Sequence, residues 1–162
     1  GGLMPAPVVP RALAMLILTA SLAAGSGCSL KTMAMKSVAG ALSDTGDVFS
    51  RDDDRKLVEG ASMFALKLSE VLLESLPKDR PLLTATCASF TQYAYAFVQS
   101  EAEILEFSDQ GAATAEKARS VKLYMRAKDY CFRALETVLP GITQNILQEP
   151  VVALKDARRR RF

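Results

Sequence analysis

The residues best placed for chemistry are the carboxylates in the segment "SEAEILEFSDQ", which are Glu101, Glu103, Glu106 and Asp109. Two carboxylates act as general acid and base only where their surroundings separate their pKa values. The 162 residues contain no His, so the commonest general base and the commonest metal ligand are both missing. No phosphate loop, nucleophile elbow or metal motif occurs in residues 28–162 either. We interpret the carboxylates as a solvated helix face, and we expect no enzyme activity, no cofactor and no metal.

The cysteines and the charge balance argue against two further kinds of function, thiol-based chemistry and nucleic-acid binding. Cys28, Cys87 and Cys131 lack the close spacing of a zinc or redox motif, so we expect no thiol-based site. Net charge is only +2, from 20 basic and 18 acidic residues. A nucleic-acid surface needs a clustered basic face, so nucleic acid is not an expected partner.

The first thirty residues are typical of a bacterial lipoprotein signal. An apolar run over 12–24 is too short to span a bilayer, and Gly25, Ser26 and Gly27 precede Cys28. We therefore expect residues 1–27 to be the signal peptide and Cys28 to carry the lipid. Ser29, which replaces the Asp of inner-membrane lipoproteins, favours a lipid-anchored periplasmic protein of the outer membrane. A non-lipid secretory signal and a short uncleaved anchor are the alternatives.

Residues 90–97, "FTQYAYAF", hold four of the eleven aromatic residues in the chain. On a helix, Phe90, Tyr93 and Phe97 fall within about 60° of each other, and Tyr95 lies roughly opposite. Flanking Ala and Glu residues favour a helix from about Pro81 to about Phe107 over a strand. Two interpretations stay open. The helix is a core helix packed between neighbours, or its side chains line a ligand cavity, with Gln92 or a Tyr hydroxyl as the polar anchor. The candidate ligand-binding residues are Phe90, Gln92, Tyr93, Tyr95 and Phe97.

The rest of the mature chain predicts helices and no strand. One short helix ends near Ser43, and a second is capped by Ser50 with Asp53 and ends at Pro77. Another follows a break at Gly111. Its expected inner stripe is Ala118, Val121, Tyr124, Ala127, Cys131, Ala134, Leu135 and Val138. A last helix could begin in "ITQNILQEPVVALKDARRRRF", although Pro150 interrupts it.

The fold class expected is all-α, with antiparallel helix pairs in a degenerate tetratricopeptide-like repeat, an α-solenoid. Small residues that let paired helices approach, followed by a Pro, are typical of such repeats. Ala127, Cys131, Ala134 and Pro140 follow that spacing loosely.

Three stretches, "RDDDRKLVEGASMFALKLSEVLLESLPKDRPLL", "FTQYAYAFVQSEAE" and "LYMRAKDYCFRALE", together resemble the TatT family. These proteins are the T-components of tripartite ATP-independent periplasmic (TRAP) transporters. The resemblance implies a lipoprotein of helical repeats that associates with a periplasmic TRAP solute-binding protein and helps deliver a hydrophobic or carboxylate ligand to it. It matches the family's lipid-bearing Cys to Cys28 and its aromatic motif to residues 90–97.

Members of that family continue beyond "LPGITQNILQEP" with further repeats, so we expect this chain to be truncated at the C-terminus. The expected divisions are a signal peptide at 1–27, a partial helical-repeat domain at 28–150 and a basic tail at 151–162. Whether this tail belongs to the native protein is left open.

We expect the protein to be a lipid-anchored accessory of TRAP-type uptake. It would hold or channel a small hydrophobic or carboxylate ligand and dock a solute-binding protein. The alternative is a helical-repeat scaffold for envelope assembly that binds no ligand. Homo-oligomerisation is left open.

Overall fold

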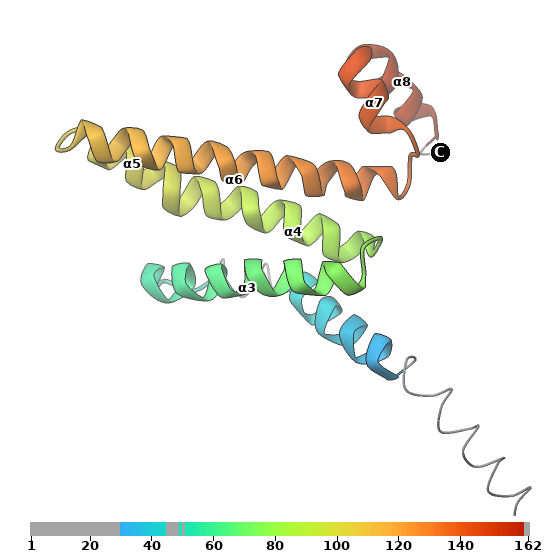
Figure 1. Ribbon diagram of the computed structural model, residues 1–162, viewed down its shortest axis with the longest axis horizontal. Coiled ribbons are helices and arrows are strands. Elements are labelled where there is room, and N and C mark those ends of the chain that lie inside the picture. The colour runs from blue at the N-terminus through green and yellow to red at the C-terminus, as the bar shows by residue number, and fades with distance from the viewer. Residues whose placement is uncertain (1–29, 45–48, 50, 161–162) are drawn as a thin grey trace, which may run out of the picture.

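The computed structural model describes residues 30–44, 49 and 51–160, and this part of the chain is all-helical (Figure 1). A helix covers residues 30–43. The elements that follow are α3 (Arg55–Ser75), α4 (Arg80–Tyr93), the π-helix η1 (Ala94–Gln99), α5 (Ser100–Leu105), α6 (Gln110–Glu136), α7 (Ile142–Gln148) and α8 (Pro150–Arg160). The expected signal at 1–27 and the expected lipid site at Cys28 lie outside the described residues. Within the described part, no helix is both long and apolar enough to cross a membrane.

Aspartate caps start the three long helices. Asp54 accepts hydrogen bonds from the backbone N–H groups of Lys56 and Leu57, both at 3.1 Å. Asp79 and Asp109 accept from the third residue beyond them, at 3.0 and 2.9 Å. Each carboxylate satisfies backbone donors that the first helical turn leaves without a partner.

Two of the predicted helix starts need correction. The second helix begins at Arg55 with Asp54 as its cap, so Asp53 is not the capping-box residue, and Ser50 lies outside the described residues. Gly111 does not break the chain, because it lies inside the first turn of α6 and the turn occupies residues 106–109. Because the Asp109 side chain caps the helix, α6 begins at Gln110, one residue before Gly111. The expected interruption at Pro150 is confirmed, because α7 ends at Gln148 and Pro150 is the first residue of α8, where its missing N–H costs nothing.

The continuous helix formed by α4, η1 and α5 confirms the helical interpretation of "FTQYAYAF". In Figure 1, α4 lies between α3 and α6, and α6 returns alongside α4 and α5. α7 and α8 pack on each other beyond the C-terminal end of α6. The aromatic segment is therefore central to the packing.

The core consists of two clusters along this helix. One contains Leu72, Leu73, Leu82, Leu83 and Ala39, so it joins the helix 30–43 to α3 and α4. The other contains Leu66, Phe90, Tyr93, Val98 and Ala127. Full burial of each large apolar side chain in these clusters contributes about 1.5–3 kcal/mol to the stability of the fold.

The buried stripe of α6 differs from the prediction. Its fully buried residues recur every seven positions and are all small, namely Ala113, Ser120, Ala127 and Ala134. Ala118, Val121, Leu135 and Val138, which we expected inside, are exposed. Small side chains let α6 approach α4 closely, and this close approach sets the rotation of the helix more strongly than the larger apolar side chains do.

Candidate functional site

An apolar groove of about 340 Å³ lies between α3 and the α4–η1 segment. We call it the aromatic groove. Val58, Ala65 and Leu66 line it from α3, whereas Gln92, Tyr93 and Phe97 line it from the opposite side. Its volume is at the lower end of the range for small-molecule sites, and its apolar wall with few polar groups is typical of them.

The groove brings together three of the five predicted ligand-binding residues. Gln92, Tyr93 and Phe97 line it, and the Tyr93 and Phe97 rings lie 5.4 Å apart between centroids. Phe90 is not in the groove, because its buried ring stacks on Tyr130 at 5.7 Å. Tyr95 points away and is 65% exposed. Tyr93 and Phe97 therefore form a groove wall, in which Tyr93 is also a buried core residue, whereas Phe90 lies only in the core and Tyr95 on the surface.

Arginines lie against the same aromatic rings. The Arg55 guanidinium carbon is 5.5 Å from the Phe97 ring centroid, and the Arg119 carbon is 5.9 Å from that of Tyr93. Arg119 also donates to the Tyr93 hydroxyl at 3.4 Å, and this hydrogen bond raises the pKa of the guanidinium. Two permanent positive charges thus lie beside the rings that form the groove wall.

The groove wall includes a π-helical segment. In η1 the N–H of Ser100 donates to the carbonyl of Tyr95, five residues back. The Ala96 carbonyl instead accepts from the Ser100 hydroxyl at 2.6 Å and from Arg55 at 3.1 Å. π-Helical turns amount to one extra residue in a helix and are frequent at functional sites. Here the turn lies where Ala96 and Phe97 face the groove.

The sequence did not predict a network of hydrogen bonds and ion pairs around the carboxylate of Glu70. Glu70 of α3, whose side chain is 16% exposed, accepts from the Tyr130 hydroxyl and pairs with Arg126 and Lys67, each at 2.9 Å. Burial, followed by the Glu70 hydrogen bond and charge, raises the pKa of Tyr130 to about 12. The seven-residue spacing of Arg119, Arg126 and Arg133 was visible in the sequence and could have indicated one basic face of α6.

The sequence analysis also missed a disulfide. Cys87 of α4 and Cys131 of α6 are bonded, with Cα atoms 5.1 Å apart, a normal separation for a cystine. The bond spans 44 residues of sequence, so no local motif could have revealed it. Cys131, which we interpreted as a packing position in a repeat, is thus a covalent link between two helices.

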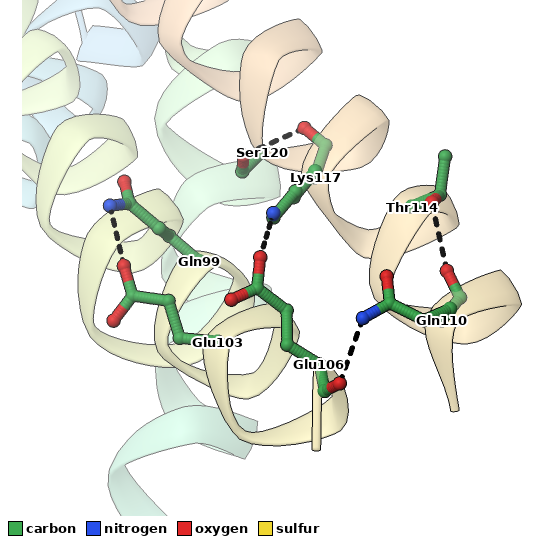
Figure 2. Close-up of polar contacts among 7 residues, drawn as sticks. All are labelled: Gln99, Glu103, Glu106, Gln110, Thr114, Lys117 and Ser120. Atoms are coloured by element: carbon green, nitrogen blue, oxygen red, sulfur yellow. Dashed lines mark hydrogen bonds and ion pairs between the residues drawn. The ribbon is translucent and has the colours of Figure 1, made fainter. Parts of the chain in front are cut away.

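The four carboxylates considered for catalysis lie at the end of the molecule where α5 meets α6. Figure 2 shows Glu103 accepting from the Gln99 amide at 2.9 Å and Glu106 paired with Lys117. Asp109 caps α6, and Glu101 is exposed. Each of the four is thus exposed, paired on the surface or used as a cap, as expected for a solvated face.

A second, larger hollow of about 640 Å³ lies between the α3–α4 turn, the end of α6 and α7. Phe132 and Pro77 give it an apolar part, and Lys78 and Arg133 give it positive charge. Glu136 on its wall accepts hydrogen bonds of 2.7 Å from the N–H groups of Gly141 and Thr143. The bonds from Thr143, then that from Gly141, lower the pKa of Glu136. Among the described residues, no group of three or more His, Cys, Asp or Glu side chains could hold a metal ion.

Comparison with known proteins identifies the family of this chain. Residues 51–160 match the family model described as TRAP transporter T-component. The chain belongs to the TRAP transporter T-component family. The match covers every element from α3 to α8, including both walls of the aromatic groove. The family consists of transporter accessory proteins and is not an enzyme family.

A relative of this T-component is an uncharacterized protein of Treponema pallidum (strain Nichols), 33% identical over 135 residues. The aligned region covers 75% of this chain and 42% of the relative, so the chain spans less than half of the curated protein that it matches. No solved structure matches the chain.

Proposed function

We propose that this T-component is a lipid-anchored periplasmic accessory of a TRAP-type uptake system that holds a small apolar carboxylate ligand in the aromatic groove. The observation that carries the proposal is the groove itself, in which Gln92, Tyr93 and Phe97 form one wall. Apolar burial against the rings would supply affinity, and the Gln92 amide would be the polar anchor. The ligand would then pass to a solute-binding protein docked on the same molecule.

The charges near the groove favour a carboxylate over a cationic ligand. Arg55 and Arg119 lie against the two rings of the wall, and neither can lose its proton at physiological pH. Neither arginine lines the groove, but their guanidinium carbons lie 5.5 and 5.9 Å from the centroids of the wall rings, so their charge would disfavour a cationic ligand and favour a carboxylate.

The disulfide supports a location outside the cytoplasm. Cys87 and Cys131, which are both half-buried, form a disulfide in a chain with three cysteines. Disulfides persist in the periplasm and are rare in a reducing cytoplasm. Together with the expected lipidation of Cys28, this favours an envelope protein, and Ser29 favours the outer membrane.

We also propose that the helix 30–43 with α3, and the α4–α5 helix with α6, are two degenerate tetratricopeptide-like repeats. The return of α6 alongside α4 and α5 (Figure 1), a Pro shortly after α3 and after α6, and the small buried residues of α6 support this arrangement. The groove would then lie between the two repeats.

A ligand screen tests the proposal. The purified protein would be heated with saturating fatty acids and dicarboxylic acids, because a ligand that binds only the folded state raises Tm by mass action. We expect at least one carboxylate to raise Tm, with no increase from the matching alcohol or amine. A flat response across the panel would contradict ligand holding and favour the scaffold function.

A partner capture tests the transport assignment independently. The lipidated protein would be isolated from its own membranes in mild detergent, and co-purifying proteins would be identified by mass spectrometry. A TRAP solute-binding protein is the expected partner. Recovery of envelope-assembly proteins in its place would contradict the assignment.

A further inference from the structure

The helix at 30–43 has one face that nothing in the described structure covers. Its opposite face packs on the core through the buried Ala39 and the half-buried Met35 and Leu42. Leu30 is 70% exposed and Met33 67%, and Val38 on the same side is 46% exposed. At about 100° per residue these three lie on the half of the helix that faces away from Ala39. We call this the outer face.

The outer face is apolar between its two flanking lysines. Ala34 and Ala41 are also exposed on it, and its one hydroxyl, that of Ser37, donates to the Met33 carbonyl at 3.1 Å. That hydroxyl is thus satisfied within the helix and does not need water.

The charges of this helix are arranged around the outer face. Lys31 and Lys36 are its only charged residues, and residues 30–43 contain no Asp or Glu. On the helix, Lys31 lies about 100° to one side of Leu30, and Lys36 lies about 120° to the other side. Both are exposed. Apolar side chains flanked by lysines are typical of helices that lie in a membrane interface, where the ammonium groups reach the phosphates.

We propose that the outer face of helix 30–43 lies on the surface of an anionic phospholipid membrane. Leu30 and Met33 would enter the acyl boundary, and Lys31 and Lys36 would contact lipid phosphates. Residue 30, the first described residue of this helix, is two positions after Cys28 in the sequence, and the inference rests on the lipid anchor of the proposed function. The contact would orient the whole domain, because Ala39 packs the helix into the core cluster of α3 and α4.

The test uses the full lipidated protein with one added cysteine at a time, labelled with an environment-sensitive dye. Met33→Cys places the dye on the outer face, and Lys122→Cys places it on the exposed side of α6 as a control. Both proteins would be reconstituted in vesicles of phosphatidylethanolamine and phosphatidylglycerol. We expect a blue shift and protection from iodide quenching at position 33 and neither effect at position 122. In a second comparison, Lys31→Gln with Lys36→Gln should reduce the shift at position 33.

The outcomes separate the two claims. Protein that floats with the vesicles while the dye at position 33 is quenched as fully as at 122 would overturn the membrane contact and leave the lipid anchor intact. Protein that does not float would overturn both the anchor and the contact. Protection at position 33 without vesicles, growing with protein concentration, would overturn the proposal because a second copy would then cover the face.

Discussion

The Tyr130 hydroxyl of α6 donates a 2.9 Å hydrogen bond to Glu70 of α3, and so connects two helices that both pack on α4. The Tyr130 ring stacks on the buried Phe90 ring of α4, so the hydrogen bond lies at the edge of the aromatic core. Because a hydrogen bond to a charged group stabilises more than one to a neutral group, this partly buried contact should make a measurable contribution to the free energy of unfolding. We expect a double-mutant cycle of Glu70→Ala and Tyr130→Phe to give a coupling energy of about 1–2 kcal/mol.

The neighbouring ion pair provides the control. Lys67 is 68% exposed in its pair with Glu70, so Lys67→Ala should change the free energy of unfolding by less than about 1 kcal/mol. Urea unfolding would measure all variants. Additive effects of Glu70→Ala and Tyr130→Phe would show that the two residues do not interact.

The raised pKa of Tyr130 predicts a loss of stability at alkaline pH. Burial and the adjacent Glu70 carboxylate raise its pKa to about 12 in the folded protein, whereas an unperturbed tyrosine titrates near 10. A group with a raised folded pKa contributes stability fully below its unfolded pKa and loses it as pH rises through the folded value. The contribution of Tyr130 should therefore fall between about pH 10 and about pH 12. Denaturant unfolding across this range should show a smaller alkaline loss in Tyr130→Phe, and an identical loss in both proteins would refute the assignment.

The Cys87–Cys131 bond should stabilise the fold chiefly by restricting the unfolded chain. For a loop of 44 residues the chain-entropy model predicts about 4 kcal/mol. The double variant Cys87→Ser with Cys131→Ser should lose about 2–4 kcal/mol in urea unfolding, since native-state effects often reduce the entropic value. Intact mass after alkylation without reductant checks that the wild-type cysteines are bonded. Equal stability of the two proteins would exclude a stabilising role.

The π-helical segment predicts an unusual tolerance to deletion. Because η1 holds one residue more than an α-helix of the same span, removing exposed Tyr95 should let it relax to an α-helix and keep α4 and α5 in place. Circular dichroism and thermal unfolding should show a folded protein close to wild type. Deletion of exposed Lys122 in α6 is the control, and it should destabilise strongly because the buried seven-residue stripe shifts out of register. Unfolding of both deletion variants would contradict this account of η1.

The helical fold was predictable because its signals are local. Apolar spacing and the positions of Pro77 and Pro81 identified the helices over 55–75 and 80–105 within a few residues, and the turn residues after Ser43 identified the end of the helix 30–43. The rotation of α6 was not predictable, because it depends on which face meets α4. Ala113, Ser120, Ala127 and Ala134 have little hydrophobicity of their own, and their importance becomes clear only when the neighbouring helix is in place.

The candidate site was half predictable for the same reason. The aromatic motif placed Tyr93 and Phe97 on one side of the helix and Tyr95 on the other, as the structure has them. Which aromatic faced a groove and which faced the core depended on α3 and Tyr130. The contacts of Glu70 with Arg126 and Tyr130, like the disulfide, join residues 44 or more positions apart, so they leave no local signal.

The most direct test of the aromatic groove compares two tyrosines of the same motif. Tyr93 lines the groove, and Tyr95, two residues away, is exposed on the opposite face. Isothermal titration calorimetry with dodecanoate and adipate would be run on Tyr93→Ala, Tyr95→Ala and the wild type, with circular dichroism to confirm that each is folded. We predict that the wild type and Tyr95→Ala bind one of these carboxylates equally and that Tyr93→Ala binds it at least about tenfold more weakly, or about 1.4 kcal/mol. Equal binding by all three proteins, or loss of binding in Tyr95→Ala alone, would contradict the groove as the ligand site.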